Sequence, residues 1–499
     1  MSEHQISIAD ANENLLNCAA YLAETIKSAD GRAEAMKEII PRFLEKNEVD
    51  LAAGLADTID DPFMRDLLLT QVAEKCAEID DDEYAFQLIE AIEDYGNQAR
   101  AREKLALQKA SKGDLEKAFE IAETLEHPDE VFAEIALREA ARGDESDALE
   151  TVEEIEFPFS KVTALQNIAA VFIKKDENTK AVKFLEDAKK IAFDIEFTEE
   201  QIRAFIEIGH NFIEAKNNSK AIETFDTAKT IAENLDNVHR DSFLAGVALG
   251  FLHAGSVDLA DRTLDLVADK TQISSCLIGF SQYYQQKSET ADALEALEEA
   301  YAILKSQKDL EIRESRTRFR LWTTIAVLFA NFEKSERAIE IAQEIPDESE
   351  QMSALAQIAQ VFASQEKVEM MRQALQGITE DSNKMFAFIG ISDVKNRSEA
   401  KAEALEYLNE AYFHAGLIHQ LGLRSRGYNE LANRFAQFDE TAKAREIFLE
   451  NLEAISQIKD VSNRAVALAQ FADVYEQAEL EVNAAEKELL ESLTRKVGI

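Results

Sequence analysis

Residues 205–228 read FIEIGHNFIEAKNNSKAIETFDTA, and this stretch decides the fold. Phe205, Ile208 and Phe212 are spaced so that they share one face of a first helix. Ala221 begins the equivalent face of a second helix, and the polar residues KNNS between the two segments predict a short turn. Neither helix can bury its apolar face alone, so the pair is stable only when it stacks on further copies of itself. The stretch therefore predicts an array of antiparallel helix pairs.

Copies of this pair extend along the chain, and each is located by the residue that corresponds to Ala221. We call this residue the reference position. It is alanine in all copies but one, which suits a point where two helices approach closely. The reference positions are Ala52, Ala85, Ala118, Ala148, Ala181, Ala221, Ala260, Ala293, Ala338, Met371, Ala404, Ala444 and Ala484. Their spacing, between 30 and 45 residues, is typical of a helical solenoid.

Glycine, proline and arginine recur at fixed distances from the reference position. Glycine lies five residues before it, where the first helix must end, at Gly113, Gly143 and Gly255. Proline lies ten residues after it, where the second helix must stop, at Pro62, Pro128 and Pro158. Pro41 falls inside a first helix and is expected to kink it. Arginine lies twenty residues before it, where we expect a pairing with the acidic end of the preceding helix, at Arg32, Arg65, Arg240, Arg318, Arg424 and Arg464.

Composition narrows the class of protein. The chain has 499 residues, of which 46% are hydrophobic, so disorder is excluded, and its five prolines favour long helices. A net charge of −43 disfavours binding to nucleic acid or to an anionic membrane. We expect no targeting signal and no membrane insertion, because no basic segment precedes an apolar run and no apolar window is long enough. The three scattered cysteines (Cys18, Cys76 and Cys276) predict a reducing compartment, and we expect a cytoplasmic protein.

The order of residues within the copies resembles the tetratricopeptide repeat. One copy matches the pattern at Leu165, Ile168, Ala169, Phe172, Ala181, Leu185 and Ala188. A second begins with the aromatic residue of the pattern and matches at Trp322, Ile325, Ala326, Phe329 and Ala338. The resemblance implies an all-α fold, a right-handed α–α superhelix of about 13 helix-turn-helix repeats. Some units have the 33-residue length of the family, and others have 40 residues, with a longer second helix.

The change of repeat length predicts four segments. They are a tail and capping half-repeat (1–30), an arm of short repeats (31–160), a region of mixed long and short repeats (161–480), and a capping helix with a tail (481–499). Ala19, in the first segment, continues the phase of the second helices backward, so we expect this segment to cap the N-terminal end of the array.

Motifs of catalysis do not appear in the sequence. It contains no Gly-rich phosphate loop, HExxH, CxxC or GxSxG pattern, so we expect no enzyme activity, no cofactor and no metal site. His210 and His253 fall on first helices of adjacent repeats. They are interpreted as polar groove residues in preference to a metal-binding pair.

The resemblance implies that first helices line a concave groove, and the later repeats place amides and arginines there. The peptide-groove candidates are Gln282, Gln286, Arg320, Asn331, Gln360, Asp393, Arg397, Arg426, Asn429, Asn433 and Gln437. Amides offer a donor and an acceptor to an extended peptide backbone, and arginine holds a carboxylate. The alternative interpretation is that these amides are only solvated surface residues.

The predicted function is therefore that of a non-catalytic scaffold or adaptor, which binds a protein or peptide segment in the groove. The charge of −43 favours a partner with basic residues. A self-assembling structural protein, a homo-oligomer of solenoids, is the alternative. Polar ends of the array would favour the first function, and exposed apolar ends would favour the second. Glu488 and Glu491 stand at positions that are apolar in other repeats, which predicts a polar end.

Overall fold

The computed structural model describes residues 5–306 and 312–495. That part of the chain holds 28 α-helices and one short 3-10 helix, and it holds no β-strand. The predicted all-α repeat fold is confirmed. Residues 1–4 and 496–499, which belong to the two predicted tails, lie outside the described residues.

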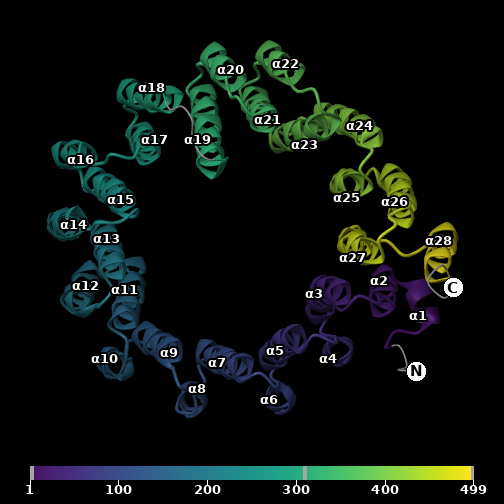
Figure 1. Ribbon diagram of the computed structural model, residues 1–499, viewed down its shortest axis with the longest axis horizontal. Helices are drawn as coiled ribbons and strands as arrows, with labels where there is room; N and C mark the ends of the chain where they lie inside the picture. Colours follow the sequence, from purple (N-terminus) through teal and green to yellow (C-terminus); the bar gives the residue numbers. More distant parts are fainter. Residues whose placement is uncertain (1–4, 307–311, 496–499) are drawn as a thin grey trace. The chain divides into compact units, whose positions relative to one another are not determined.

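Helices alternate along the chain as first and second members of repeats (Figure 1). The first helices are α3 (Ala29–Glu45), α5 (Pro62–Glu78), α7 (Tyr95–Lys112), α9 (Asp129–Arg142), α11 (Pro158–Lys174), α13 (Thr198–Glu214), α15 (Arg240–His253), α17 (Lys270–Gln286), α19 (Ile312–Asn331), α21 (Glu348–Ser364), α23 (Asp381–Arg397), α25 (Leu421–Gln437) and α27 (Val461–Gln477).

The second helices are α4 (Val49–Asp57), α6 (Asp82–Ala91), α8 (Leu115–Ala122), α10 (Glu145–Glu154), α12 (Asn178–Ile191, followed by the 3-10 turn η1, Ala192–Asp194), α14 (Asn218–Glu233), α16 (Val257–Leu264), α18 (Thr290–Ser306), α20 (Ser335–Gln343), α22 (Val368–Gln376), α24 (Lys401–Leu417) and α26 (Thr441–Ser456). Three further helices lie at the ends of the chain: α1 (Ile8–Glu13), α2 (Leu15–Glu24) and α28 (Ala484–Arg495).

Every first helix ends at a residue with positive φ, five residues before the reference position. Glycine takes this conformation at Gly113, Gly143 and Gly255, with φ of 88°, 99° and 86°. The other repeats use non-glycine residues there: Asn47, Asp80, Asp176, Lys216, Ser288, Glu333, Glu366, Glu399, Asp439 and Glu479. The residue that follows then donates its N–H to a carbonyl in the last turn of the first helix, as Asp144 does to Glu139 at 3.0 Å. The predicted helix ends are confirmed, and the left-handed turn belongs to every repeat.

The reference positions from Ala52 to Ala444 are all buried, as close helix crossing requires. Ala484 is the exception, because it lies exposed at the start of α28. The last reference position was therefore assigned wrongly. Instead Ala19 on α2, which lies 33 residues before Ala52, is fully buried.

The chain divides into two compact units. The first unit comprises Met1–Leu105 together with Met352–Ile499, and the second comprises Ala106–Gln351. The first unit therefore contains both ends of the chain, whereas the predicted segments followed the order of the sequence.

Within the first unit, the N-terminal helices pack on the C-terminal ones. Figure 1 shows α1 and α2 (purple) beside α27 and α28 (yellow). Helix α2 packs along α27 as a second helix packs on the first helix of its own repeat, and α3 packs on the same α27. The thirteenth helix pair is thus formed by α27 and α2, which come from opposite ends of the chain. We call the contact of α1–α3 with α27 and α28 the terminal junction.

Polar contacts of the terminal junction repeat those between ordinary neighbours. Arg42 on α3 holds both carboxylate oxygens of Asp473 on α27, with Nε–O distances of 2.9 and 3.0 Å. Arg434 on α25 likewise holds both carboxylate oxygens of Asp393 on α23, through Nε at 2.8 Å and Nη2 at 2.9 Å. In both pairs the aspartate is the thirteenth and the arginine the fourteenth residue of a 17-residue helix. The α27–α3 contact therefore has the register of consecutive repeats.

Helix α28 does not take the role of a polar cap on α27. It packs against α1, α2 and α26, where Leu490 and Leu493 are fully buried. Lys487 of α28 pairs with Glu13, and the Thr494 hydroxyl donates to the Asn12 side chain at 3.0 Å. The segments that were expected to cap the two ends separately instead cover each other.

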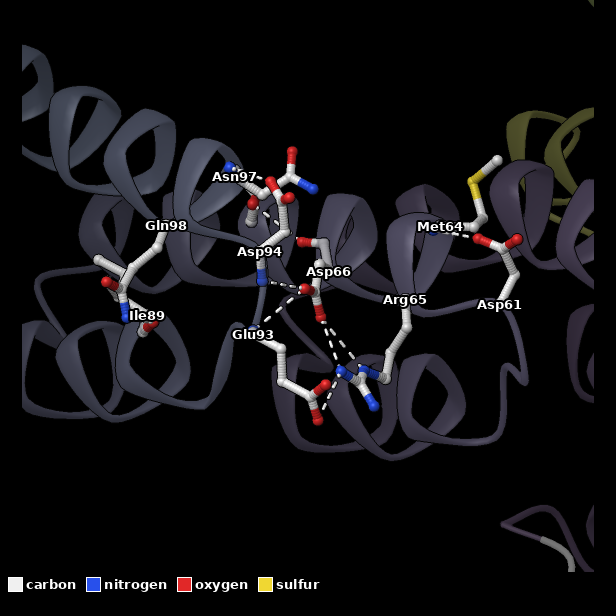
Figure 2. Close-up of polar contacts among 10 residues, drawn as sticks. Asp61, Met64, Arg65, Asp66, Ile89, Glu93, Asp94, Asn97 and Gln98 are labelled. Atoms are coloured by element: carbon white, nitrogen blue, oxygen red, sulfur yellow. Dashed lines mark hydrogen bonds and ion pairs between the residues drawn. The ribbon is translucent and has the colours of Figure 1, made fainter.

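In the described ranges, an aspartate at one repeat position connects successive repeats in three places, and it is buried in two of them. Figure 2 shows Asp66 on α5, which accepts the backbone N–H groups of Glu93 and Asp94 at 3.0 and 2.8 Å. The segment before α7 is thereby held against α5. The same position is occupied by Asp129 on α9 and by Asp241 on α15, each of which accepts two backbone N–H groups.

The arginines twenty residues before the reference position have two kinds of partner. Arg32, Arg424 and Arg464 donate through Nε to a main-chain carbonyl six residues earlier, just beyond the preceding second helix. Arg65 and Arg240 instead pair with the adjoining aspartate, as Figure 2 shows for Arg65 and Asp66 at 3.0 Å. The expected pairing with an acidic helix end is thus corrected for the first three. Their Nε partners are main-chain carbonyls that follow the end of the preceding helix, and Arg32 in addition pairs with Asp60 at 3.1 Å.

Candidate binding surface

Helix α27 exposes a stripe between two neighbouring first helices of the first unit. Asn463, Val466 and Gln470 follow one another at helical spacing on this face, and none of them is buried. A pocket of about 810 Å³ lies on the side of α25, and a second one of about 560 Å³ lies on the side of α3. The three residues belong to both pockets, so the two pockets adjoin along α27. We call this region the α25–α27–α3 surface.

The α25 side of the surface carries cations. Arg426 from α25 and Lys459 from the loop before α27 line the larger pocket, and both side chains are exposed. Neither has an ion pair within the described part of the chain. A carboxylate that enters this pocket can therefore pair with a guanidinium and an ammonium group.

The α3 side of the surface carries carboxylates. Asp30, Glu34 and Glu38 lie one helical turn apart along α3, and Asp460 adds a fourth carboxylate from the start of α27. Glu38 is partly compensated by Arg42 at 3.5 Å. The pocket is built only where the terminal junction forms, and the Ser462 hydroxyl marks this contact by donating to the Gly31 carbonyl at 2.9 Å.

Amide groups continue the surface toward the far end of α27. The Asn433 amide donates to Gln477 on α27 at 3.1 Å, and Gln437 donates to Asn433 at 3.2 Å. These amides bind one another on the exposed side of α25 and α27. An arriving peptide backbone can exchange these contacts for its own, because each amide carries both a donor and an acceptor.

The other candidates in the first unit differ in their surroundings. Asp393 is bound by Arg434, so it is not free to hold a ligand cation. Asn429 accepts from the buried Asn451 on α26 at 2.6 Å, which places it between the two helices of its repeat. The Gln360 amide occupies the space beside Gly390 that a Cβ would need, and Arg397 is exposed at the end of α23. The structure therefore brings together Arg426, Asn433 and Gln437, and it leaves the others apart from them.

Four candidates lie in the second unit, on its own first helices. Gln282, Gln286, Arg320 and Asn331 are all exposed on α17 and α19. Close to the first two, rings from successive first helices form a row. His210 on α13 lies 6.1 Å from His253 on α15, and His253 lies 5.6 Å from Tyr283 on α17 (ring centroids).

Burial lowers the pKa of both histidines in this row, so they are neutral at pH 7. The described residues contain no group of three or more potential metal ligands. Whether His210 and His253 act as polar groove residues stays a prediction. Helices α13 and α15 approach each other closely at Gly209 and Gly250. At both glycines the Phe225 ring fills the space that a Cβ would need.

Sequence reasoning missed Glu34, Glu38, Asn463 and Gln470. A signal for three of them existed, because Arg426, Val466 and Glu34 stand at one repeat position and Gln470 and Glu38 stand four residues later. The sequence does not show that α3 packs beside α27 as the next first helix. The ion pair across that contact joins residues 431 positions apart in the chain.

Comparison with known proteins gives structural likeness only. No protein-family model and no curated protein sequence matches the chain. Similar solved structures include Ton1535 from Thermococcus onnurineus, with 17% identity, a TM-score of 0.26, and coverage of 71% of this chain and 98% of that one. Another is a STAND signal-transduction ATPase with a tetratricopeptide repeat sensor from Pyrococcus horikoshii, with 16% identity, a TM-score of 0.28, and coverage of 76% and 52%.

A third similar structure is aspartyl phosphate phosphatase F from Bacillus subtilis, with 10% identity, a TM-score of 0.30, and coverage of 87% of this chain and 96% of that one. No residue role or ligand is carried over from these proteins, because the TM-scores show a low overall superposition. The helix pairs, their turns and their buried alanines are those of this chain itself. In fold the chain is a tetratricopeptide-like helical-repeat protein, as the residue pattern predicts.

Proposed function

We propose that the chain is a non-catalytic interaction protein, which holds an extended segment of a partner protein on the α25–α27–α3 surface. The observation that carries this proposal is the pair of adjoining pockets along α27, with Arg426 and Lys459 in one and a row of α3 carboxylates in the other, while Asp460 lines both. The segment would cross α27 from the α25 side to the α3 side, over two distances between neighbouring helix axes of about 8–10 Å each. About five to six extended residues cover that length.

The charges of the surface determine which end of the bound segment lies on the α3 side and which lies on the α25 side. A basic side chain is favoured beside Glu34 and Asp30, neither of which has an ion pair in the described ranges. An acidic side chain or a terminal carboxylate is favoured beside Arg426. Between them, Asn463 and Gln470 can satisfy the peptide backbone without selecting particular side chains. The partner class is thus a peptide segment with a basic group and an acidic group, in keeping with the net charge of −43.

A scaffold of this kind needs no catalytic group, and we propose that the chain has no enzyme activity. We also propose a cytoplasmic location, which the three separate, buried cysteine thiols support. No described helix has the length and apolarity needed to cross a membrane. Self-assembly by stacking of free ends has less support, because α2 and α27 cover each other.

Fluorescence anisotropy with labelled peptides of about six residues tests the proposal. One peptide carries Lys at one end and Asp at the other, and two further peptides carry only Lys or only Asp. We expect the mixed peptide to bind, and Arg426→Glu to weaken its binding by about tenfold. Glu34→Lys should weaken binding similarly, and a peptide without Lys should be insensitive to it.

The matched control is Arg320→Glu, because Arg320 occupies the same repeat position on α19 of the second unit. It should leave binding unchanged. Equal losses with Arg426→Glu and Arg320→Glu, or no binding of the mixed peptide, would contradict the proposal.

A further inference from the structure

A second cavity lies between the second helices α22 and α24 of the first unit, away from the α25–α27–α3 surface. Its volume is about 740 Å³, within the range of ligand-binding pockets. Helix α22 has nine residues and α24 has 17, so α24 is longer by about 12 Å. The later turns of α24 therefore have no second helix beside them on this side.

Part of the cavity wall is apolar and held in place, and the charged side chains of Arg372 and Lys384 line the cavity as well. Met371 and Leu375 face it from α22, and Phe388 faces it from α23. The Phe388 ring is nearly parallel to His414, with 5.6 Å between centroids and an angle of 13°. His414 is held in turn by Asp381, with 2.8 Å between Nδ1 and Oδ1. The result is a rigid aromatic wall next to an aliphatic one.

In two other pairs of neighbouring second helices, side chains fill the space that corresponds to this cavity. Between α18 and α20, the Tyr301 hydroxyl donates to Glu344, Lys305 pairs with the same carboxylate, and the Arg337 guanidinium lies 4.8 Å from the Tyr301 ring centroid.

Between α24 and α26, the Tyr412 hydroxyl donates to Glu450 at 2.7 Å, and Lys443 lies 4.0 Å from the Tyr412 ring centroid. Both glutamates stand six residues after the reference position. Each thus receives a tyrosine from the preceding second helix, and a cation lies beside the ring.

Glu410 is the equivalent glutamate on α24. The tyrosine and the cation that accompany the other two glutamates are missing here. The position that supplies tyrosine in the other pairs is Thr379, which lies beyond the end of α22. The position of Arg337 and Lys443 is taken by Glu403, which pairs with Lys395 on α23. Glu410 lines the cavity, is exposed, and has no ion pair within the described residues.

We propose that this cavity binds a helical segment of a partner protein, which inserts a tyrosine beside Glu410 and places a lysine or arginine one turn away. Tyr301 and Lys305, four residues apart on α18, show that one helix can supply both groups to one glutamate. The apolar side of the segment would cover Met371 and Leu375, in the manner of a helix bound in a groove.

The site goes beyond the peptide surface proposed above and does not depend on it. A second copy of this chain is not the occupant that the structure favours, because both of its Tyr-x-x-x-Lys pairs are engaged. Tyr301 is buried in its own repeat, and the Tyr283 ring stacks on His253 with Lys287 5.6 Å from its centroid.

The test uses a fluorescein-labelled helical peptide of about 14 residues, with Leu at helical spacing on one face and Tyr-x-x-x-Lys beside it. Anisotropy with the full chain should show saturable binding. Glu410→Lys should weaken it by about tenfold. Changing the peptide's Tyr to Ala, or its Lys to Glu, should each weaken binding to the original chain by a similar factor.

The matched control is Glu299→Lys, because Glu299 is exposed at the same repeat position on the long helix α18. Leu277 and Ile303 stand there at the positions of Phe388 and His414, which form the aromatic wall of the cavity. It should leave binding unchanged, and so should Arg426→Glu on the other surface. The proposal is overturned if the peptide does not bind. It is overturned as well if Glu410→Lys and Glu299→Lys act alike, or if the Ala and Glu peptides bind as tightly as the first.

Discussion

The repeat made by α25 and α26 and the one made by α27 and α2 differ in connectivity. In the first, a short turn at Asp439 joins the two helices. In the second, the partner helix comes from the other end of the chain. The packing is nevertheless of the same kind, with a fully buried alanine, Ala19, at the crossing. A repeat can thus form from any two helices with matching surfaces, and the two helices need not be neighbours in the sequence.

The cost of joining distant segments explains why such a contact can form. Loop-closure entropy rises only with the logarithm of loop length, by about 0.6 kcal/mol for each doubling. The repeats between the two ends are themselves ordered, which lowers this cost further. Burial of the apolar face of α2 against α27 can therefore offset the closure.

Removal of residues 1–25 should give the largest effect and tests whether α27 depends on α2. Helix α2 has eight buried residues, so we expect a loss of several kcal/mol in unfolding free energy. Hydrogen exchange in α27 should accelerate strongly, and light scattering should report association through the uncovered face. A synthetic peptide of residues 5–28 should restore protection.

The matched truncation removes residues 484–499, which carry α28. It should have a smaller effect on exchange in α27, because α28 is not the second helix of that repeat. Unchanged exchange in α27 after removal of residues 1–25 would mean that the terminal junction does not form in solution.

Leu22→Ala and Leu55→Ala compare the terminal junction with an ordinary repeat at one position. Each leucine lies three residues after a buried alanine, Ala19 or Ala52, and both are fully buried. We expect each change to cost about 2–5 kcal/mol in unfolding free energy, because it leaves a cavity in a packed interface. Chemical denaturation measures both. A cost near zero for Leu22→Ala alone would show that α2 undocks before the protein unfolds.

Two double-mutant cycles compare the equivalent ion pairs. Arg42→Gln with Asp473→Asn tests the α27–α3 contact, and Arg434→Gln with Asp393→Asn tests the α23–α25 contact. The side chains are similarly accessible, at 17% and 37% in the first pair and 20% and 42% in the second. We expect a coupling of about 0.5–1 kcal/mol in both, which salt should weaken. Coupling in the second cycle only would place the contact of Arg42 and Asp473 outside the native structure in solution.

Thiol labelling compares how often the two regions open. Burial raises the pKa of Cys18 on α2 and Cys276 on α17 to about 12, so neither is a thiolate at pH 8 in the folded protein. Labelling therefore requires opening. We expect Cys18 to react faster, because undocking of α1 and α2 exposes it without unfolding of a covalently linked pair.

Variants that retain one cysteine separate the two rates, with Cys76 changed to alanine in both. A faster reaction of Cys276 than of Cys18 would show that the terminal junction is the more stable of the two regions.

Much of the fold could be predicted from local patterns. The periodic apolar residues located the helices, and the recurring alanine located the crossings from Ala52 to Ala444. The reference position is wrong at Ala484. This alanine follows a left-handed turn at Glu479, as the other reference positions do, but the helix that it begins is not the second helix of a repeat. Helix α28 instead packs on α1, α2 and α26, and no pattern within its own sequence states which neighbour it will have.

Less of the binding surface could be predicted. Arg426, Asn433 and Gln437 were found from their repeat positions, and they lie together on α25. Asn429 and Asp393 were found by the same rule, yet they bind Asn451 and Arg434 within the protein. A repeat position indicates which face of a helix a residue occupies. It does not show whether a neighbouring side chain already binds the residue and so prevents it from binding a ligand.

The amino-acid sequence by itself determined the helix pairs, their order and the left-handed residue that ends each first helix. These features depend on contacts between residues within about 40 positions, which the periodic pattern records. Only the tertiary structure decided that α2 completes the repeat of α27, that α3 supplies carboxylates on the side of α27 opposite Arg426, and that the cavity at Glu410 is left open. The reason is that repeat surfaces are alike, so many pairings satisfy the pattern, and only the packed chain selects one of them.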